Sequence, residues 1–220
     1  MEFPMRFFSL LATCALIAGI SAPALAGSND MRIRPYLGFD LQRTNYSYNE
    51  NYAVPGGALN GETILEDTLD GGNIHIGARL GKYLGIEAGY FHNIDKDKDI
   101  AAGTLVGPGT IALAAFSTNV ETKGFSLDLM GYIPIDQSSK LELIATGGLT
   151  YTQAEIELSS AAVGVDKADE DEFGFRLGGG LQYNITDDLN LRGLVRYQSA
   201  DFEDAVEDAW TYSAGINYLF

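Results

Sequence analysis

The sequence predicts an all-β fold, a transmembrane up-and-down barrel of eight antiparallel strands. Three observations predict it: segments in which apolar and polar residues alternate, connections that are alternately short and long, and aromatic residues near the strand ends. The 26 glycines, 12 tyrosines and 11 phenylalanines suit short twisted strands with aromatic edges. Beyond residue 26 there is no run of about 20 apolar residues, which argues against a helical membrane protein.

The first 26 residues are expected to be a cleaved signal peptide, which leaves residues 27–220 as one barrel domain. Arg6 precedes an apolar run over residues 7–20, and Ala24-Leu25-Ala26 is a small-x-small cleavage pattern. Cys14 lies inside the apolar run and not after it, so we do not expect lipidation. The remaining chain has no cysteine and therefore no disulfide.

Eight segments show the period of two that a strand with two different faces requires. In the first segment Leu37 and Phe39 share one face, and Asp40 lies on the other. At about ten residues per strand, about 3.3 Å per residue and a tilt of about 40°, each strand spans roughly 25 Å of membrane. The predicted strands are residues 33–43, 73–82, 84–93, 123–134, 140–152, 173–184, 189–198 and 210–220.

The predicted connections fall into two classes, as in outer-membrane barrels. Three are tight, at residues 81–84, 134–139 and 185–188, and four are long, at residues 44–70, 93–122, 154–172 and 199–209. This arrangement places both termini on the periplasmic side and the four long loops outside.

The second long loop carries an apolar stretch, residues 101–116, with a turn signal at Gly107-Pro108-Gly109. We expect the third and fourth strands to continue beyond the membrane as a hairpin that bends there. Its apolar edge would pair with another chain by strand addition or pack on the neighbouring loops, and the sequence leaves both alternatives open.

The polar face of the strands is rich in glycine and nearly neutral in charge, which suits the lining of a narrow barrel. Opposite charges can satisfy one another there, away from bulk water. We predict an ion-pair network in the lumen formed by Arg34, Asp40, Arg79, Glu87, Asp128, Glu142, Arg176, Arg192 and Arg196. Replacing Arg176 or Asp128 alone is expected to destabilise the barrel by roughly 3–5 kcal/mol, because a buried charge loses its partner.

The aromatic residues of the apolar face fall at two heights, as in the two interfacial girdles of a membrane barrel. A soluble barrel has no reason to sort its aromatic residues in this way. The predicted outer girdle contains Tyr90, Phe125, Tyr151, Phe173, Tyr197, Trp210 and Tyr212, and the inner girdle contains Tyr183, Tyr218 and Phe220.

Three segments carry a family resemblance: residues 84–91 (LGIEAGYF), residues 174–197 and residues 212–220 (YSAGINYLF). They resemble the OmpA-like outer-membrane β-barrels, a family of small porin-like proteins of Gram-negative bacteria. The resemblance implies an outer-membrane location and a signal for the barrel-assembly machinery at Ile216, Tyr218 and Phe220. The likeness ends at Phe220, so the cell-wall anchoring of longer family members is not carried over.

Acidic residues concentrate in the four long loops, which hold 21 Asp and Glu against 3 Lys in a chain of net charge −16. The densest patches are residues 166–172 and 201–208. The acidity argues against nucleic-acid binding, which needs a basic face. It leaves three interpretations: solvation of a surface loop, divalent-cation bridging to lipopolysaccharide, or binding of a basic host or surface ligand.

No motif indicates a metal, a cofactor or catalysis. Residues 95–99 (DKDKD) have the spacing that opens a calcium loop, but Ile100 and Val106 replace the glycine and glutamate that such a loop requires. His75 is predicted to point inward and His92 to lie near the rim, where no serine nucleophile accompanies it.

The sequence therefore predicts a non-enzymatic outer-membrane barrel that contributes to envelope integrity and presents acidic loops for surface interaction or adhesion. The alternative is a narrow channel for ions or very small solutes. A lipid-modifying enzyme is a third and more distant interpretation.

Overall fold

The computed structural model describes residues 32–48, 52–54, 57–107, 110–112, 114–136, 140–160, 164–202 and 206–220. The predicted signal peptide lies outside these residues. None of the helices in this part of the chain is long and apolar enough to cross a membrane.

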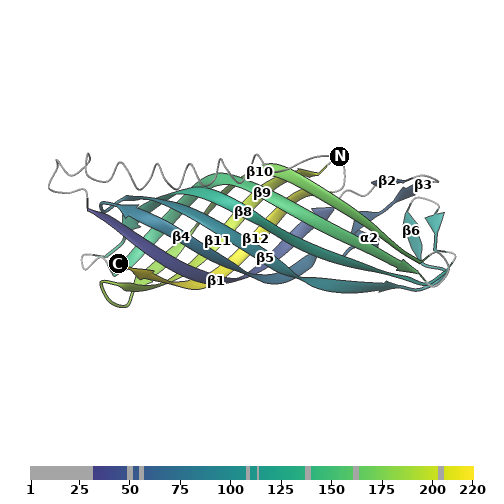
Figure 1. Ribbon diagram of the computed structural model, residues 1–220, viewed down its shortest axis with the longest axis horizontal. Coiled ribbons are helices and arrows are strands. Elements are labelled where there is room, and N and C mark those ends of the chain that lie inside the picture. The colour runs from purple at the N-terminus through teal and green to yellow at the C-terminus, as the bar shows by residue number, and fades with distance from the viewer. Residues whose placement is uncertain are drawn as a thin grey trace.

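Eight long antiparallel strands close into a barrel in the order β1-β12-β11-β10-β9-β8-β5-β4 (Figure 1). Each strand pairs with its neighbours in the chain, and the ring closes where β1 pairs with β12. The predicted fold class is confirmed. The strands are β1 (Ile33–Tyr48), β4 (Thr68–Leu80), β5 (Leu84–Ile100), β8 (Phe116–Pro134), β9 (Leu141–Ser160), β10 (Gly164–Asn184), β11 (Leu189–Phe202) and β12 (Val206–Leu219).

The barrel turns its apolar residues outward and its polar residues inward, the reverse of a soluble barrel. In β8, Leu127 and Leu129 are 50% and 69% exposed, whereas Asp128 between them is 1% exposed. The same alternation runs through β1, where Leu41 is exposed and Asp40 is buried. An apolar exterior of this extent suits lipid as the surrounding solvent.

The two ends of the barrel differ. At one end, called here the turn end, β1 begins, β12 ends and short turns join β4 to β5, β8 to β9 and β10 to β11 (Figure 1). At the opposite end, called the loop end, the strands continue well past the predicted limits. The hairpin predicted for the third and fourth strands is confirmed, because β5 and β8 stay paired up to Ile100 and Phe116.

The long loop predicted at residues 154–172 is wrong. β9 runs to Ser160 and β10 starts at Gly164, and the two strands stay paired to these residues. The segment carries charged residues at many positions, so its sequence has the composition of a loop. The backbone ladders with β8 and β10 nevertheless keep it extended.

The first long connection contains two short strands, β2 (Tyr52–Val54) and β3 (Gly57–Leu59), and the one-turn helix α2 (Gly61–Ile64). The second contains the strand pair β6 (Leu105–Gly107) and β7 (Thr110–Ile111). Pro108 and Gly109 of the predicted turn lie outside the described residues.

An apolar core closes the loop end and is called here the loop-end cap. It gathers residues from α2, from the two loops and from the inner faces of the long strands: Tyr46, Tyr48, Ile64, Leu65, Leu69, Ile100, Val106, Ala112, Val120 and Ala209. The Asn60 side chain caps α2 by accepting a hydrogen bond from the Thr63 amide. The Asn60 amide donates to the Val106 carbonyl at 2.7 Å and so joins the first loop to the second.

The loop-end cap decides between the two alternatives for the apolar stretch at residues 101–116. Val106 is 2% exposed, Ala112 is buried, and Phe116 packs against the cap. The stretch therefore packs on the neighbouring loop, although Leu105 and Ile111 remain exposed.

Candidate functional site in the lumen and the loop-end sheet

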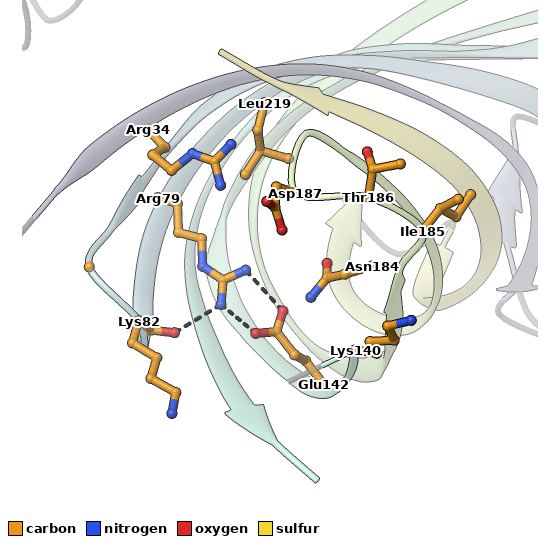
Figure 2. Close-up of a pocket in the computed structure, with 11 residues that line it drawn as sticks. Arg34, Arg79, Lys82, Lys140, Glu142, Asn184, Ile185, Thr186, Asp187 and Leu219 are labelled. Carbon is orange, nitrogen blue, oxygen red and sulfur yellow. Dashed lines mark hydrogen bonds and ion pairs between the residues drawn. The ribbon is translucent and has the colours of Figure 1, made fainter. Parts of the chain in front are cut away.

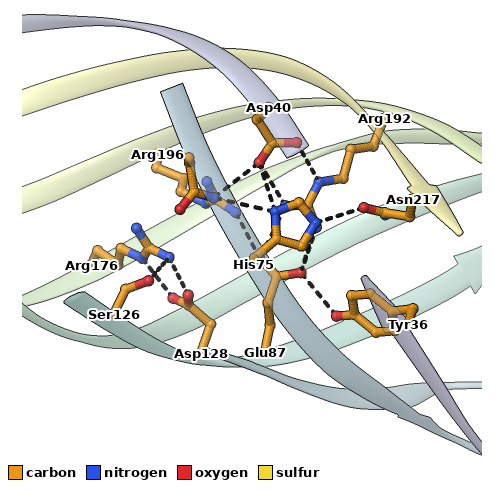
Figure 3. Close-up of polar contacts among 11 residues, drawn as sticks. Tyr36, Asp40, His75, Glu87, Ser126, Asp128, Arg176, Arg192, Arg196 and Asn217 are labelled. Carbon is orange, nitrogen blue, oxygen red and sulfur yellow. Dashed lines mark hydrogen bonds and ion pairs between the residues drawn. The ribbon is translucent and has the colours of Figure 1, made fainter. Parts of the chain in front are cut away.

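The centre of the lumen holds an ion-pair layer organised around Arg192 of β11 (Figure 3). Its guanidinium donates to Asp40 of β1 at 2.7 and 2.9 Å and to Glu87 of β5 at 2.5 and 3.0 Å. All three side chains are 1% exposed or less. One cation thus links β1, two strands away in the ring, with β5 on the opposite side, through charge-assisted hydrogen bonds of the strong kind.

Neutral polar groups complete the same layer. The Tyr36 hydroxyl donates to Glu87 at 2.9 Å, and the Asn73 amide donates to Asp40 at 3.2 Å. His75 lies between the two carboxylates and shares a hydrogen bond of 2.6 Å with Asn217. Alternation places Tyr36 and His75 on the inner face, but it gives no sign that they join this network.

A second buried ion pair lies beside the first. Arg176 donates to both oxygens of Asp128 and to the Ser126 hydroxyl, and the Arg176 and Asp128 side chains are 7% and 0% exposed. β8 and β10 contribute these groups, and β9 between them contributes only Gly148 at this level.

Arg196 is buried but has fewer contacts than its neighbours. One terminal nitrogen lies 3.6 Å from Glu87, and the side chain is 2% exposed. Among the described residues, neither Nε nor Nη2 of Arg196 has a hydrogen-bond partner. Thr150 and Ser213 also have buried hydroxyls without a partner there, and water commonly satisfies buried polar groups of this kind.

Gly215 explains why glycine is frequent on this face. A Cβ atom at this position would lie 2.0 Å from an Asp40 carboxylate oxygen and 2.3 Å from the Phe39 carbonyl oxygen. Any larger residue would displace the carboxylate that Arg192 holds.

At the turn end, Arg79 and Glu142 form a bidentate ion pair with distances of 2.6 and 2.9 Å (Figure 2). The Arg79 guanidinium also lies 4.3 Å from the centre of the Tyr132 ring, an attractive cation–π geometry. Tyr132 belongs to a buried apolar group with Met130, Ile144 and Leu194. These residues fill the lumen between the turn end and the central layer, and the predicted charge network did not include them.

Arg34 does not join the lumen network, so this part of the prediction is wrong. Its guanidinium pairs with Asp188 in the β10–β11 turn at 2.8 Å, and both side chains are partly exposed. The residue lies at the start of β1, where the barrel opens to solvent and the inner face is no longer enclosed. Arg34 and Arg79 both line an open cavity of about 450 Å³ at this end, which Lys82 and Lys140 also line (Figure 2).

The predicted girdle residues lie on the outer face, and several of them pair across strands. The ring centres are 5.1 Å apart for Tyr90 and Phe125 and 4.8 Å apart for Tyr151 and Phe173. Tyr197 contacts Trp210 across β11 and β12 at 5.3 Å, and Tyr218 contacts Phe220 at the end of a single strand, β12, at 5.1 Å. Tyr183, Tyr212 and Ile216 are exposed on the same face.

Beyond Tyr151 and Phe173, the strands β5, β8, β9 and β10 continue as a sheet, called here the projecting sheet. Glu121 of β8 lies directly opposite Glu155 of β9, and Asn119 lies opposite Glu157. Lys167 contacts Glu157 at 2.7 Å and Glu155 at 3.3 Å. Hydrogen bonds to these two carboxylates raise the pKa of Lys167.

The outer face of this sheet is hollowed into an acidic depression of about 410 Å³. Its charged lining consists of Asp95, Asp97, Glu121, Glu155, Glu157 and Lys167. The predicted acidity of the loop end is thus carried partly by an ordered sheet. The rejected calcium pattern, residues 95–99, lies within β5 and is extended.

The two histidines have ordinary partners. His75 is enclosed in the central layer, and His92 Nδ1 lies 3.7 Å from Glu121 at the outer face. Both are in the positions that alternation predicted, inward for His75 and near the rim for His92.

A closed ring with an apolar exterior, aromatic pairs on its outer face and a charged interior is the architecture of a transmembrane outer-membrane barrel. The family model of the outer membrane protein beta-barrel domain matches residues 12–220. The chain belongs to this family and is a bacterial outer-membrane protein. The predicted resemblance is thereby confirmed.

Solved structures agree on the fold. The outer membrane protein OprG from Pseudomonas aeruginosa is 15% identical, with 85% of this chain and 96% of that chain covered and a TM-score of 0.55. A major outer membrane protein from Thermus thermophilus is 16% identical, with 84% of this chain and 99% of that chain covered and a TM-score of 0.54. At these identities the likeness shows the fold alone. No curated protein sequence matches the chain.

Proposed function

We propose that this protein is a closed, non-enzymatic barrel that supports the outer membrane and presents an acidic surface for interaction at its loop end. One observation carries the proposal: side chains fill the lumen at successive levels. The Arg79–Glu142 pair lies at the turn end, the Arg192 layer at the centre and the loop-end cap at the other end. Eight strands enclose a space that side chains can fill, as they do here.

The proposal places the loop end outside the cell and both chain termini in the periplasm. In this orientation the acidic depression of the projecting sheet lies at the height of the lipopolysaccharide head groups. Removal of residues 1–26 and assembly through Ile216, Tyr218 and Phe220 remain part of the proposal.

The acidic depression is suited to basic groups. Lys167, the cation in its lining, already contacts two of its carboxylates, which shows the kind of group that fits there. Within the described residues, no three acidic or histidine side chains are grouped so that they could hold a metal ion. We therefore favour a basic host or surface ligand over divalent-cation bridging to lipopolysaccharide.

The absence of enzymatic activity is also a proposal. His75 contacts Asp40, Glu87, Arg192 and Asn217 inside the barrel, where a lipid or peptide substrate cannot reach it. His92 contacts Glu121, which lacks the nucleophilic hydroxyl or thiol that acyl transfer requires.

A narrow channel is the alternative, and two observations favour it. The cavity of about 450 Å³ opens the turn end to solvent, and Arg196 leaves buried nitrogen atoms to be hydrated. A further pocket lined by Tyr36 and Tyr132 has a volume of about 10 Å³, near the minimum for a single water molecule. The small size of this pocket favours a closed lumen.

A flux assay separates the two functions. Protein purified from outer membranes is reconstituted into vesicles, and swelling is measured in glycerol and in a small sugar, with an open porin as positive control. The proposal predicts swelling no faster than in empty vesicles. Sugar-driven swelling that increases with protein content would establish the channel instead.

A further inference from the structure

The projecting sheet has two edges, and they differ in how they are covered. β8 and β9 stay paired up to Phe116 and Ser160, and β9 and β10 stay paired up to Ser160 and Gly164. The ladder between β10 and β11, by contrast, ends at the pair Arg176 and Gln198. In the described part of the chain, no strand continues the sheet beyond β10 at residues 164–171.

β11 leaves the sheet at a defined point. The carbonyl oxygen of Ser199 lies so close to Gly174 that a Cβ atom there would be 2.2 Å away. Beyond its last pair with β10, β11 pairs with β12 up to Phe202, and that ladder shifts register between Ser199 and Phe202. β11 therefore ends at Phe202, whereas β10 stays paired with β9 as far as Gly164, beyond the β10–β11 ladder.

The opposite edge, on β5, is covered by the first loop. Lys98 Nζ donates to the carbonyl oxygens of Glu62 and Leu65, each at 2.7 Å. Lys96 Nζ donates to the Thr68 carbonyl at 2.8 Å. The fold thus covers one edge of the projecting sheet with its own chain, whereas the edge at residues 164–171 receives no comparable strand or helix among the described residues.

The open edge is strongly acidic. Residues 164–172 read GVDKADEDE, with five carboxylates and one lysine. Like charges placed opposite each other destabilise a strand pair, so a second copy of this edge is a poor partner. A basic strand meets complementary charge together with a row of main-chain donors and acceptors.

We propose that residues 164–171 of β10 accept an extended, basic segment of another protein as an added strand. The inference rests on the proposed function, because it names the class of partner that the acidic loop end binds. The added strand would extend the projecting sheet and lie next to the acidic depression. A charged edge that only prevents aggregation is the competing interpretation, and binding of a basic peptide to the edge separates the two.

The test uses protein purified from outer membranes and a peptide of alternating lysine and valine, long enough to span residues 164–171. A second peptide has the same sequence with every other peptide nitrogen methylated, which keeps the charge and removes edge hydrogen bonds. Because each lost hydrogen bond weakens binding by about 0.5–1.5 kcal/mol, methylation should lower the affinity about tenfold or more. Amide hydrogen exchange over residues 164–171 should slow when the unmodified peptide binds.

Two variants localise the site. Asp169→Asn with Glu170→Gln removes two charges from the edge strand, and Asp187→Asn with Asp188→Asn removes two charges from the β10–β11 turn at the turn end as a matched control. The edge variant should lower affinity at least about threefold more than the control, because Asp169 and Glu170 belong to the edge strand itself. The control residues lie at the other end of the barrel, where salt screens their charges from the added strand.

Equal binding of the two peptides would overturn the proposal, since charge alone would then explain the affinity. Equal losses in the two variants, or no peptide binding, would overturn it as well. None of these results bears on the closed lumen, which the flux assay tests. Swelling in that assay would overturn the proposed function whatever the peptides do.

Discussion

Replacement of Arg192 by methionine tests whether the central ion-pair layer holds the barrel together. Methionine matches the aliphatic stem of the arginine side chain but removes the guanidinium. Asp40 and Glu87 then remain at positions that are 1% exposed or less, without the cation that binds both of them.

The structure sets the expected size of the effect. Arg192 makes four hydrogen bonds to the two carboxylates. Asp40 keeps its bond from Asn73, and Glu87 keeps its bond from Tyr36 and the nearby Arg196. Because a buried charge without its partner costs roughly 3–5 kcal/mol, Arg192→Met should lower the free energy of unfolding by about that amount.

Arg43→Met is the matched control. Arg43 also forms a bidentate pair, with Asp70 at 2.6 and 3.1 Å, but its side chain is 61% exposed. An exposed ion pair contributes about 0–1 kcal/mol, so this variant should unfold almost as the native protein does. A triple variant, Arg192→Met with Asp40→Asn and Glu87→Gln, leaves no stranded charge and should recover much of the lost stability.

The assay is urea-induced unfolding in lipid vesicles, followed by the fluorescence of Trp210, the only tryptophan of the chain. Trp210 lies on the outer face of β12 and reports transfer between lipid and water. Equal unfolding free energies for Arg192→Met and Arg43→Met would refute the assignment of Arg192 as a buried structural cation.

Three further predictions concern other levels of the barrel. Leu69→Ala removes a fully buried side chain from the loop-end cap and should cost about 2–5 kcal/mol, measured by urea unfolding, and an unchanged midpoint would contradict the packing of the cap. Gly215→Val should sharply reduce the yield of folded, heat-modifiable barrel, since a Cβ atom would lie 2.0 Å from Asp40, whereas Gly193→Val, where a Cβ meets only the Ser213 carbonyl oxygen at 3.8 Å, should change it much less. Phe220→Ala should lower outer-membrane assembly in cells without lowering refolding in vitro, and equal losses in both would show a structural role alone.

Alternation predicted the barrel well because lipid and lumen impose opposite demands on successive residues. The exposed Leu127 and Leu129 and the buried Asp128 were all on the predicted faces. The rule fails where both faces are polar, as in residues 154–172. There the side chains do not distinguish a strand from a loop, and only the backbone ladders with β8 and β10 decide.

The inner face could be listed from the sequence, but its pairing could not. Arg192 reaches across the ring to Glu87, 105 positions away in the chain, and no local pattern predicts that contact. Arg34 occupies an inward-facing position in the alternating pattern, but it lies too near the mouth of the barrel to be enclosed. Tyr132 and Ile144 lie inside the lumen as part of a buried hydrophobic cluster. Near the turn end, therefore, hydrophobic packing fills the interior in place of ion pairs.

The central claim is that the lumen is closed, and single-channel recording in a planar bilayer tests it most directly. Native protein purified from outer membranes should give no stable openings over a wide voltage range. The triple variant that removes the Arg192 layer should also stay silent, because the loop-end cap and the apolar group around Tyr132 remain in place. Stable ohmic openings of the native protein would contradict the account and establish a channel.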